Sequence, residues 1–462
     1  MATIIKTGKP VATQPIKSGQ ALGAILAALG LDRTIPLIHG AQGCSAFAKI
    51  FFIQHFHEPI PLQSTAMDPI TTVMGSDDNI VQALDTLCQK NQPKLIVLLS
   101  SGVAEAQGCD LRRALKLFRA DYPRHDKVEI VTVNTPDFYG SLENGYSALL
   151  EALVEQLIPQ QPVRNVRKKR VNLLLSHMLS PGDVELIRSY VEAFGLQPVL
   201  LPDLSRSLDG HLVRSDYLSV SQGGTDLALL KQMGQSALTL VVGPSLQRVG
   251  QLLESRTGVP CHYFPHLMNL QQVDCFIDLL RRQADRLVPE WIERQRGQLL
   301  DAMIDTHTWV NGRRFGLAAE ADLLGAWLGF AQMVGLAPSC VVAPVNQPML
   351  ASLPVEQVLV GDLEDLADNL QAQGADLLLT NAHGAVIAER LGLPLLRIGF
   401  PVFDEFGAFR RVRQGYAGMR DTLFELGNLG QAACHHRPAY HSPYKQPVEQ
   451  IRGRALAAEV IG

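Results

Sequence analysis

The chain has 462 residues, a formal net charge of −4 and 47% hydrophobic residues. A typical domain size of about 150 residues predicts about three domains, and so small a net charge gives no electrostatic reason to expect nucleic-acid binding. No apolar run reaches the roughly 20 residues that cross a bilayer, so we expect no membrane association. The seven cysteines are scattered and none forms a CxxC pair, which argues against a disulfide framework and favours a cytoplasmic protein.

Strand-like apolar segments alternate with helical segments in three successive sets along the chain. The sets are residues 35–38, 95–99 and 128–133, then 171–175, 198–201 and 238–242, then 340–342, 358–360, 377–379 and 395–398. Continuous apolar strands with helices between them are typical of parallel sheets that are covered on both faces. The predicted fold class is therefore α/β, with three Rossmann-like domains, each a mostly parallel sheet flanked by helices.

Two polar segments mark the predicted domain boundaries. A Pro-Gln-Gln-Pro stretch at residues 159–162 precedes a basic run that ends at Arg170, which is typical of a solvated linker. Residues 289–298 are polar and form the second, weaker boundary. The predicted domains are residues 1–163, which carry Cys44, residues 164–295, and residues 296–462, which include a C-terminal extension.

Cys44 lies where an apolar strand and a glycine-containing turn lead into a helix predicted for residues 45–56. A thiol at a helix N-terminus meets the positive end of the helix dipole and unpaired backbone N–H groups, which favour the thiolate. Gly40 and Gly43 leave space for a bulky group to approach the backbone. Such a thiolate is suited to be a nucleophile, a redox thiol or a metal ligand. The alternative is a small buried residue that fills a turn.

Three segments of the first domain follow predicted parallel strands directly. They are residues 39–44, 100–105 and 134–139. Because α/β sheets bind ligands outside the carboxyl ends of their strands, we expect these segments to line one crevice. This crevice brings Cys44 together with Ser100, Ser101 and the Thr135-Pro136 turn.

Other cysteines and histidines carry weaker signals. His55 and His57 lie two residues apart on a helix and point to different faces, so a shared metal ion is not expected. Cys88 follows the buried pattern of its helix, and Cys109 is predicted near the crevice, just inside a helix. His383 opens a helix at the end of a strand, without an evident partner.

Two further histidine groups are predicted to be structural or superficial. His262 and His266 flank a turn after a strand and are expected to hydrogen-bond backbone carbonyls. Residues 434–436, Cys-His-His, lie in a predicted terminal loop. A single cluster of this kind, without a second pair of ligands, is more often a group of surface residues than a metal site. The chain contains no GxxxxGK[ST], GxGxxG or GxSxG motif, so we predict no nucleotide binding and assign no catalytic residue.

Several motifs together resemble one known family. They are His-Gly-Ala-Gln-Gly-Cys at residues 39–44, Phe-Phe-Ile-Gln-His-Phe-His-Glu-Pro at 51–59, Asn-Thr-Pro-Asp-Phe-Tyr-Gly-Ser at 134–141, Gly-Gly-Thr at 223–225, and Arg-Ile-Gly-Phe-Pro-Val-Phe-Asp at 397–404. In this order they resemble the β-type subunits of the nitrogenase component 1 family. The landmarks span nearly the whole chain, which makes the match specific.

The chain departs from the catalytic β subunit at the cluster ligands. The nitrogenase β subunit supplies three cysteines to its eight-iron cluster, whereas here Leu62 stands at the second position and residues 101–105 contain no cysteine at the third. Only Cys44 remains. This pattern resembles the cofactor-assembly members of the family.

The resemblance implies a β-like subunit of a scaffold complex. On this complex the iron–molybdenum cofactor precursor is matured by insertion of molybdenum and homocitrate, and is then passed to apo-nitrogenase. Cys44 is the single ligand that the chain is expected to give to a [4Fe-4S] cluster. The other ligands come from an E subunit, which holds most of the precursor, in an α2β2 heterotetramer.

The resemblance also implies transient partners. These are the nitrogenase Fe protein, which delivers electrons, the precursor donor and apo-nitrogenase. Residues 45–49 and 102–106 are mostly small, and we expect them to form part of the Fe protein docking face.

Three alternatives remain open. A catalytic nitrogenase β subunit requires the two missing cysteines. A β-like subunit of dark-operative protochlorophyllide reductase is expected to have an aspartate in place of Cys44. A sugar-nucleotide glycosyltransferase also stacks Rossmann-like domains, but this alternative leaves the ordered family landmarks unexplained and predicts that loss of Cys44 has no effect.

Overall fold

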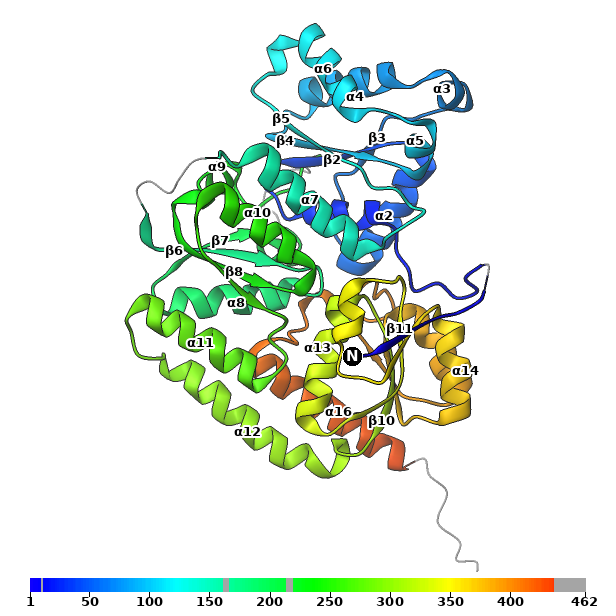
Figure 1. The fold of residues 1–462 in the computed structure, drawn as a ribbon, viewed down its shortest axis with the longest axis vertical. Helices are drawn as coiled ribbons and strands as arrows, with labels where there is room; N and C mark the ends of the chain where they lie inside the picture. The colour runs from blue at the N-terminus through cyan, green and yellow to red at the C-terminus, as the bar shows by residue number, and fades with distance from the viewer. Residues whose placement is uncertain (10, 161–165, 213–218, 436–462) are drawn as a thin grey trace, which may run out of the picture.

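The computed structural model describes residues 1–9, 11–160, 166–212 and 219–435. In these segments the strands form three separate sheets, and every strand pairing is parallel. Figure 1 shows one unit around each sheet: a blue-to-cyan unit at the top, a green unit at the left and a yellow-to-orange unit below. The predicted α/β class with Rossmann-like units is confirmed.

The first unit is built on a sheet with strand order β3-β2-β4-β5. Its strands are β2 (Thr34–His39), β3 (Gln63–Ser64), β4 (Leu95–Ser100) and β5 (Glu129–Val133), and its helices are α1 (Gln20–Leu29), α2 (Gln42–Phe56), α3 (Pro69–Met74), α4 (Asp77–Lys90), α5 (Gly102–Gln107), α6 (Leu111–Asp121) and α7 (Leu142–Leu157). Every residue of β2 and β4 is buried, because helices cover both faces. Ile35 and Leu37 pack with α4 and α6, whereas Ile38 packs with α1, α2 and α7.

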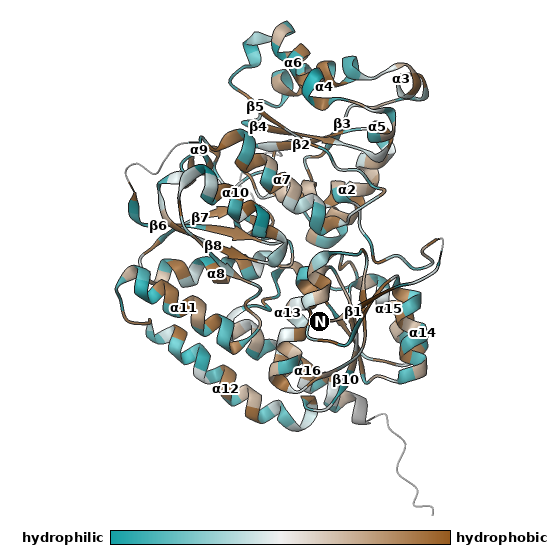
Figure 2. Ribbon diagram, viewed as in Figure 1, coloured by the Kyte–Doolittle hydropathy of each residue, from teal (hydrophilic) through white to brown (hydrophobic). Residues whose placement is uncertain are grey.

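The second unit has strand order β7-β6-β8-β9. Its strands are β6 (Arg167–Leu175), β7 (Gln197–Leu201), β8 (Ser236–Val242) and β9 (Cys261–Phe264), and its helices are α8 (Pro181–Ala193), α9 (Leu227–Lys231), α10 (Gln247–Thr257) and α11 (Leu270–Ala284). Figure 2 shows the central parts of β6, β7 and β8 as mostly hydrophobic, while α11 and α12 on the outside carry mixed hydrophilic and hydrophobic residues. The long helix α12 (Glu290–Val310) leads from this unit to the next.

The third unit has the largest sheet, with strand order β1-β12-β11-β10-β13-β14. Its strands are β1 (Thr3–Lys6), β10 (Arg314–Ala318), β11 (Ala337–Ala343), β12 (Gln357–Val360), β13 (Leu377–Thr380) and β14 (Leu395–Arg397), and its helices are α13 (Ala321–Val334), α14 (Leu363–Gln373), α15 (Ala385–Leu391) and α16 (Gly415–His435). Helix α16 packs along α12. The sequence patterns predicted β11 to β14 but missed β1 and β10.

Two features of the structure bear on the predicted domain boundaries at residues 163 and 295. The boundaries themselves remain a proposal. Strand β1 pairs with β12, with Thr3 opposite Gln357, so the N-terminal strand lies in the third sheet and not with the rest of residues 1–163. Residue 163 lies outside the described residues, and residue 295 falls within the continuous helix α12.

The three units share buried apolar surfaces. One buried cluster joins Leu26 and Phe52 of the first unit to Leu174 of the second unit and to Phe409, which follows the third sheet. Another joins the second unit to α13 and α16. Within the described residues, no helix combines the length and the apolar character needed to cross a membrane.

Candidate functional site

The carboxyl ends of β2, β4 and β5 bring the three predicted segments together. A Cβ atom at Gly40 would lie 2.8 Å from Ser101 Oγ, so the turn before Cys44 packs closely against the start of α5. The Thr135 N–H donates to Ser100 Oγ (2.7 Å), and Thr135 Oγ1 donates to the Ser100 carbonyl (2.5 Å). The expected convergence of these segments is therefore present in the fold.

Cys44 is the third residue of α2, which begins at Gln42 and not at residue 45 as the sequence pattern predicts. Its N–H donates to the carbonyl of Ala41 (3.2 Å), and Ala41, as the N-cap, offers no side-chain hydrogen bond to the helix. The side chain of Cys44 is exposed. The interpretation of Cys44 as a small buried turn residue is therefore wrong, because the helix begins at the protein surface.

His39 holds the turn before Cys44 in place from beneath. This buried ring contacts Thr65 Oγ1 through Nδ1 and Ser76 Oγ through Nε2, each at 2.9 Å. Burial lowers the pKa of His39 to about 4, so the ring is neutral at physiological pH. The strand end, the segment after β3 and the start of α4 are thereby tied together.

The other half of α2 is anchored to the third unit. Phe52 and Phe56 pack against Phe400, with ring centroids 5.3 and 6.5 Å away. Nδ1 of His55 lies 3.0 Å from the Val402 amide nitrogen and 3.1 Å from its carbonyl oxygen. Helix α2 therefore reaches from the third unit to the surface and fixes the position of Cys44.

His55 of α2 and His57, which caps this helix, lie against different parts of the structure. His55 is buried against Val402, and burial lowers its pKa to about 4. His57 ends the helix in the left-handed conformation, with φ of 56°, and lies beside Phe406. The two rings contact different neighbours.

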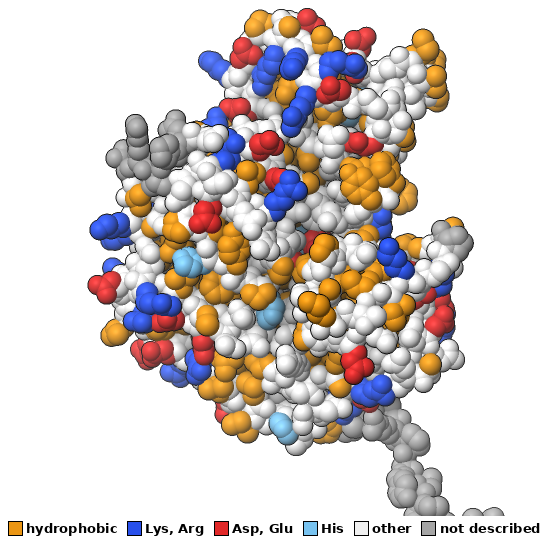
Figure 3. Space-filling view, viewed as in Figure 1, with side chains coloured by type: hydrophobic (Ala, Val, Ile, Leu, Met, Phe, Trp, Pro, Cys, Tyr) orange, Lys and Arg blue, Asp and Glu red, His pale blue; other side chains and the backbone are white. Residues whose placement is uncertain are grey.

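Large apolar side chains are exposed on the elements around Cys44. We call them the apolar rim: Phe47 and Ile50 on α2, Val103 on α5, and Phe138 and Tyr139 in the segment after β5. Phe47 is 69% exposed and Phe138 is 68% exposed, both far more than is usual for phenylalanine. Figure 3 shows hydrophobic side chains gathered at the right edge of the upper unit, over α2 and α3. Apolar groupings of this kind mark interaction surfaces.

The remaining described cysteines near the first sheet are poor ligands. Burial raises the pKa of Cys88 and of Cys109 to about 11, so both remain thiols. Cys109 lies between α5 and α6, which corrects its predicted place just inside a helix. At the second ligand position expected from the resemblance, Leu62 is completely buried, and in the segment 101–105 expected to hold the third, Ser101 caps α5 by accepting from the Ala104 N–H (3.2 Å). Cys44 is the exposed thiol at this sheet edge.

The other histidine candidates have structural surroundings. His266 is buried and its Nδ1 accepts from the Met268 N–H (3.2 Å), which corrects the expected bond to a carbonyl. His262 lies within β9 and not in a turn after a strand. The His383 ring lies between Phe51 and Phe403, with centroids 6.3 and 5.4 Å away. His436 and the side chains of Cys434 and His435 lie outside the described part of the structure.

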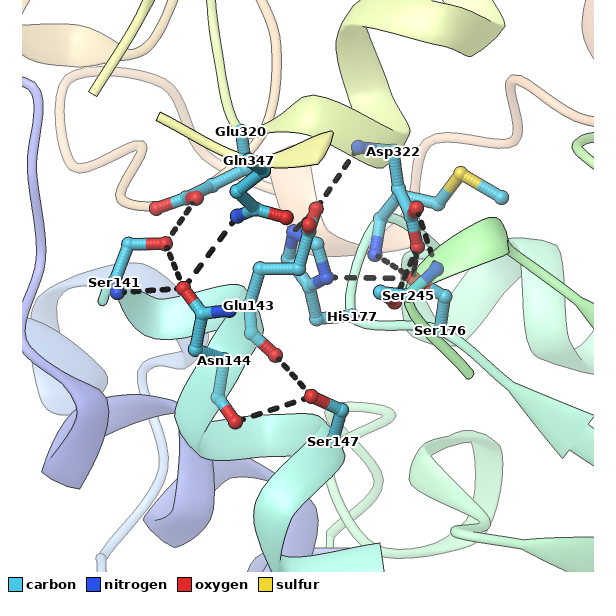
Figure 4. A network of polar contacts seen from close by, with 11 residues as sticks. Ser141, Glu143, Asn144, Ser147, Ser176, His177, Ser245, Glu320, Asp322 and Gln347 are labelled. Carbon is cyan, nitrogen blue, oxygen red and sulfur yellow. Dashed lines mark hydrogen bonds and ion pairs between the residues drawn. The ribbon is translucent and has the colours of Figure 1, made fainter. Parts of the chain in front are cut away.

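A second polar site, missed by the sequence analysis, lies where the three units meet (Figure 4). Glu143 comes from α7, His177 follows β6, and Asp322 opens α13. One ligand atom from each lies within 4.8 Å of the other two. We call these three residues the junction cluster. No sequence motif connects them, because they are separated by 34 and 145 residues in the chain.

Burial governs the protonation of the junction cluster and its neighbour Glu320. Burial, with the neighbouring Asp322 and Glu320 carboxylates, raises the pKa of Glu143 well above its usual value. Burial also raises the pKa of Asp322, raises that of Glu320 to about 7, and lowers that of His177 to about 3. In each case the low-dielectric interior disfavours the charged form.

Fold and site together define a class: a protein of three parallel α/β units with one exposed thiol at the carboxyl edge of its first sheet. A family model described as nitrogenase component 1 type oxidoreductase matches residues 19–430. The chain belongs to this family.

Individual relatives and structures support the assignment. The chain is 57% identical to the nitrogenase iron-molybdenum cofactor biosynthesis protein NifN of Klebsiella pneumoniae, over 99% of this chain and 100% of that protein. It is 41% identical to the NifN protein of Rippkaea orientalis (strain PCC 8801 / RF-1), over 93% of this chain and 96% of that protein. The solved structure titled nitrogenase Cp1 at pH 6.5 is 26% identical and superposes with a TM-score of 0.87, over 96% of this chain and 98% of that one.

Proposed function

We propose that this chain is the β-like subunit of a scaffold on which the iron–molybdenum cofactor precursor of nitrogenase is matured. The observation that carries this proposal is the 57% identity to a cofactor biosynthesis protein over 99% of the chain. The absence of cysteine from residues 62 and 101–105 favours this role over a catalytic β subunit. The presence of Cys44 disfavours a protochlorophyllide reductase subunit, and the family assignment disfavours a glycosyltransferase.

Cys44 is proposed as the single ligand of this chain to a [4Fe-4S] cluster. A cluster of this type needs about four ligands, usually thiolates. The thiols of this sheet edge fit one ligand position of such a cluster, because Cys44 is exposed while Cys88 is buried and Cys109 is half-buried, each with its pKa raised to about 11. The rigid anchoring of α2 holds the Cys44 sulfur at the surface, and the cluster, when bound, supplies electron transfer. The remaining thiolates then come from a partner, which the family resemblance identifies as the E subunit.

The apolar rim is proposed as part of the interface with this partner. A thiol that completes a cluster from another chain must lie within an area that both chains cover. Phe47 and Ile50 lie on the same helix as Cys44, and Val103 and Phe138 lie on the neighbouring segments. Burial of these side chains stabilises the pairing by removing apolar surface from water. The assembly expected from the resemblance is an α2β2 heterotetramer located in the cytoplasm.

The nitrogenase Fe protein is proposed to dock transiently across the edge of this interface, over residues 45–49 and 102–106, which include Phe47 and Val103 of the apolar rim. Residues 45–49 lie in the first half of α2 and residues 102–106 make up most of α5, and Ala46 and Ala106 are exposed. Small exposed side chains allow a close approach to the cluster that Cys44 helps to hold. The precursor donor and apo-nitrogenase complete the proposed set of partners.

The proposed function is tested by reconstituting cofactor maturation. The chain is co-purified anaerobically with the E subunit, loaded with precursor, and incubated with molybdate, homocitrate, Fe protein, MgATP and apo-nitrogenase. We expect acetylene reduction to appear only when all components are present. If the complex with Fe protein alone reduces substrate, the catalytic β-like alternative is correct. If complete mixtures without this chain activate apo-nitrogenase equally well, the scaffold role is wrong.

A further inference from the structure

The junction cluster places two hydrogen-bond acceptors face to face in the protein interior. His177 Nε2 lies 3.8 Å from Glu143 Oε2, and the side chains are 5% and 0% exposed. No described residue lies in hydrogen-bond geometry with His177 Nε2 or Glu143 Oε1, and the nearby Gln347 side chain favours the charged form of Glu143. Glu143 Oε2 accepts from the Asp322 N–H (2.8 Å), and the nearby Gln347 amide donates to Asn144 Oδ1 (3.4 Å). A buried polar atom without a hydrogen bond destabilises the folded protein, so these two atoms require a partner such as a proton, a water molecule or a cation.

The hydrogen bonds around Ser176 determine which nitrogen of His177 carries the proton (Figure 4). Ser176 Oγ donates its single hydrogen to Asp322 Oδ2 (2.5 Å), so it has only lone pairs left for His177 Nδ1, 3.3 Å away. Nδ1 must therefore be the N–H donor of the neutral ring. Nε2 then presents a lone pair toward the Glu143 carboxyl, and this contact is favourable only when a proton of Glu143 or a metal cation lies between the two groups.

The third member of the cluster is held firmly as an oxygen donor. Asp322 Oδ2 accepts from both Ser176 Oγ and Ser245 Oγ at 2.5 Å, and Asp322 Oδ1 accepts from the Ser245 N–H at 3.0 Å. Hydrogen bonds of this kind orient carboxylate ligands in metal sites. Among the described residues, no lysine or arginine forms an ion pair with Glu143 or Asp322, so no protein cation balances them.

Two small cavities lie beside His177. A cavity of about 30 Å³ is lined by His177 and Glu320, and a second cavity of about 80 Å³ is lined by His177 and Trp327. A water molecule needs at least about 10–15 Å³ of such space. Of the junction cluster, His177 alone lines these cavities, so they offer space for water on the His177 side of the cluster.

We propose that Glu143, His177 and Asp322 together bind one divalent transition-metal ion. One imidazole and two carboxylates suit Zn²⁺, Mn²⁺ or Fe²⁺. The ion bridges the two facing acceptors, neutralises the buried carboxylates and supplies the cation that the junction lacks. Since each ligand comes from a different unit, the ion also ties the three units together. This site is separate from Cys44 and does not depend on the proposed cofactor-scaffold role.

The test is a Mn²⁺ titration of the full-length purified protein, with bound metal measured from the loss of the free-ion EPR signal. We expect one saturable site in the wild type. Glu143→Gln and His177→Gln should weaken binding more than about 100-fold, beyond the about 10–100-fold that loss of an outer partner costs. Ser245→Ala, which removes such a partner, should fall within the smaller range. Glu320→Gln is the matched control, a buried carboxyl in the same region that should retain the site.

Two results overturn the proposal: no saturable Mn²⁺ binding by the wild type, or equal affinity in wild type and in both ligand variants. If a ligand variant fails to fold, the proposed site is tested on the wild-type protein alone. Pulsed EPR of its bound Mn²⁺ should then show coupling to one directly coordinated imidazole nitrogen. Bound Mn²⁺ without this coupling contradicts the role of His177, and so contradicts the proposed site.

Discussion

Replacing Glu320 with glutamine should remove a pH dependence from the stability of the protein. Glu320 Oε2 accepts a 2.6 Å hydrogen bond from Ser141 Oγ, and burial raises the pKa of Glu320 from 4.5 to about 7. A shift of about 2.5 units corresponds to about 3 kcal/mol, because each pKa unit is worth about 1.4 kcal/mol. Glu320 is largely but not fully buried, so about 3 kcal/mol is an upper value for the effect.

The direction in which pH changes the free energy of unfolding follows from the pKa of Glu320 in the folded and in the unfolded protein. Below pH 4.5, Glu320 is protonated in both the folded and the unfolded protein and has no effect on their balance. Between pH 4.5 and about 7 the unfolded protein loses the proton while the folded protein keeps it, so the free energy of unfolding falls as pH rises. Glutamine resembles the protonated carboxyl and does not titrate. The free energy of unfolding of the variant should therefore equal that of the wild type at low pH and exceed it by up to about 3 kcal/mol at pH 8.

The assay is chemical denaturation of wild type and variant at several pH values from 5 to 8, followed by circular dichroism under reducing conditions. Glu155→Gln, at an exposed position on α7, is the matched control and should not change the pH profile. If the difference in free energy of unfolding between wild type and variant is the same at pH 5 and pH 8, Glu320 does not titrate as its burial requires. A Glu320→Gln variant that is less stable than wild type at pH 8 would refute the reasoning altogether.

Two further predictions concern the surroundings of Cys44. Phe52→Ala, at a fully buried position against Phe400, should lower the free energy of unfolding by about 3–5 kcal/mol. Phe47→Ala, at an exposed position, should change the free energy of unfolding of the chain alone by less than about 0.5 kcal/mol. Denaturant titration measures both variants, and equal losses of stability would contradict the different packing of the two rings. Iodoacetamide should alkylate Cys44 in the folded chain, whereas Cys88 should react only after unfolding because it is buried with its pKa raised to about 11. Peptide mass spectrometry measures both reactions, and rapid labelling of Cys88 in the folded chain would be inconsistent with the core described above.

The features that were predictable from the sequence are the ones whose causes are local. Strands β2 and β4 are continuous apolar runs because both faces of their sheet are covered, and this pattern is visible in the sequence. The meeting of the three segments near Cys44 followed from the rule that parallel strands end at one edge. The exposure of Cys44 was not predictable, because it depends on how far the neighbouring units extend over α2.

The missed features depend on contacts between distant parts of the chain. Strand β1 has only four residues and owes its place to pairing with β12, more than 350 residues away. Strand β10 begins with Arg314 and contains Gly316, so it lacks a continuous apolar run. The junction cluster has no spacing signal, since its members come from three units and become neighbours only when these units pack together.

Anaerobic co-purification of the chain with the E subunit, with Cys44→Ala compared to wild type, tests whether Cys44 is a ligand of the shared cluster. Iron content and the EPR spectrum of the dithionite-reduced complex are recorded for both. The account predicts that the variant still assembles but loses or alters a [4Fe-4S] signal, because Cys44 is the exposed thiol at the sheet edge. An unchanged cluster in the assembled variant would contradict the assignment of Cys44 as a ligand.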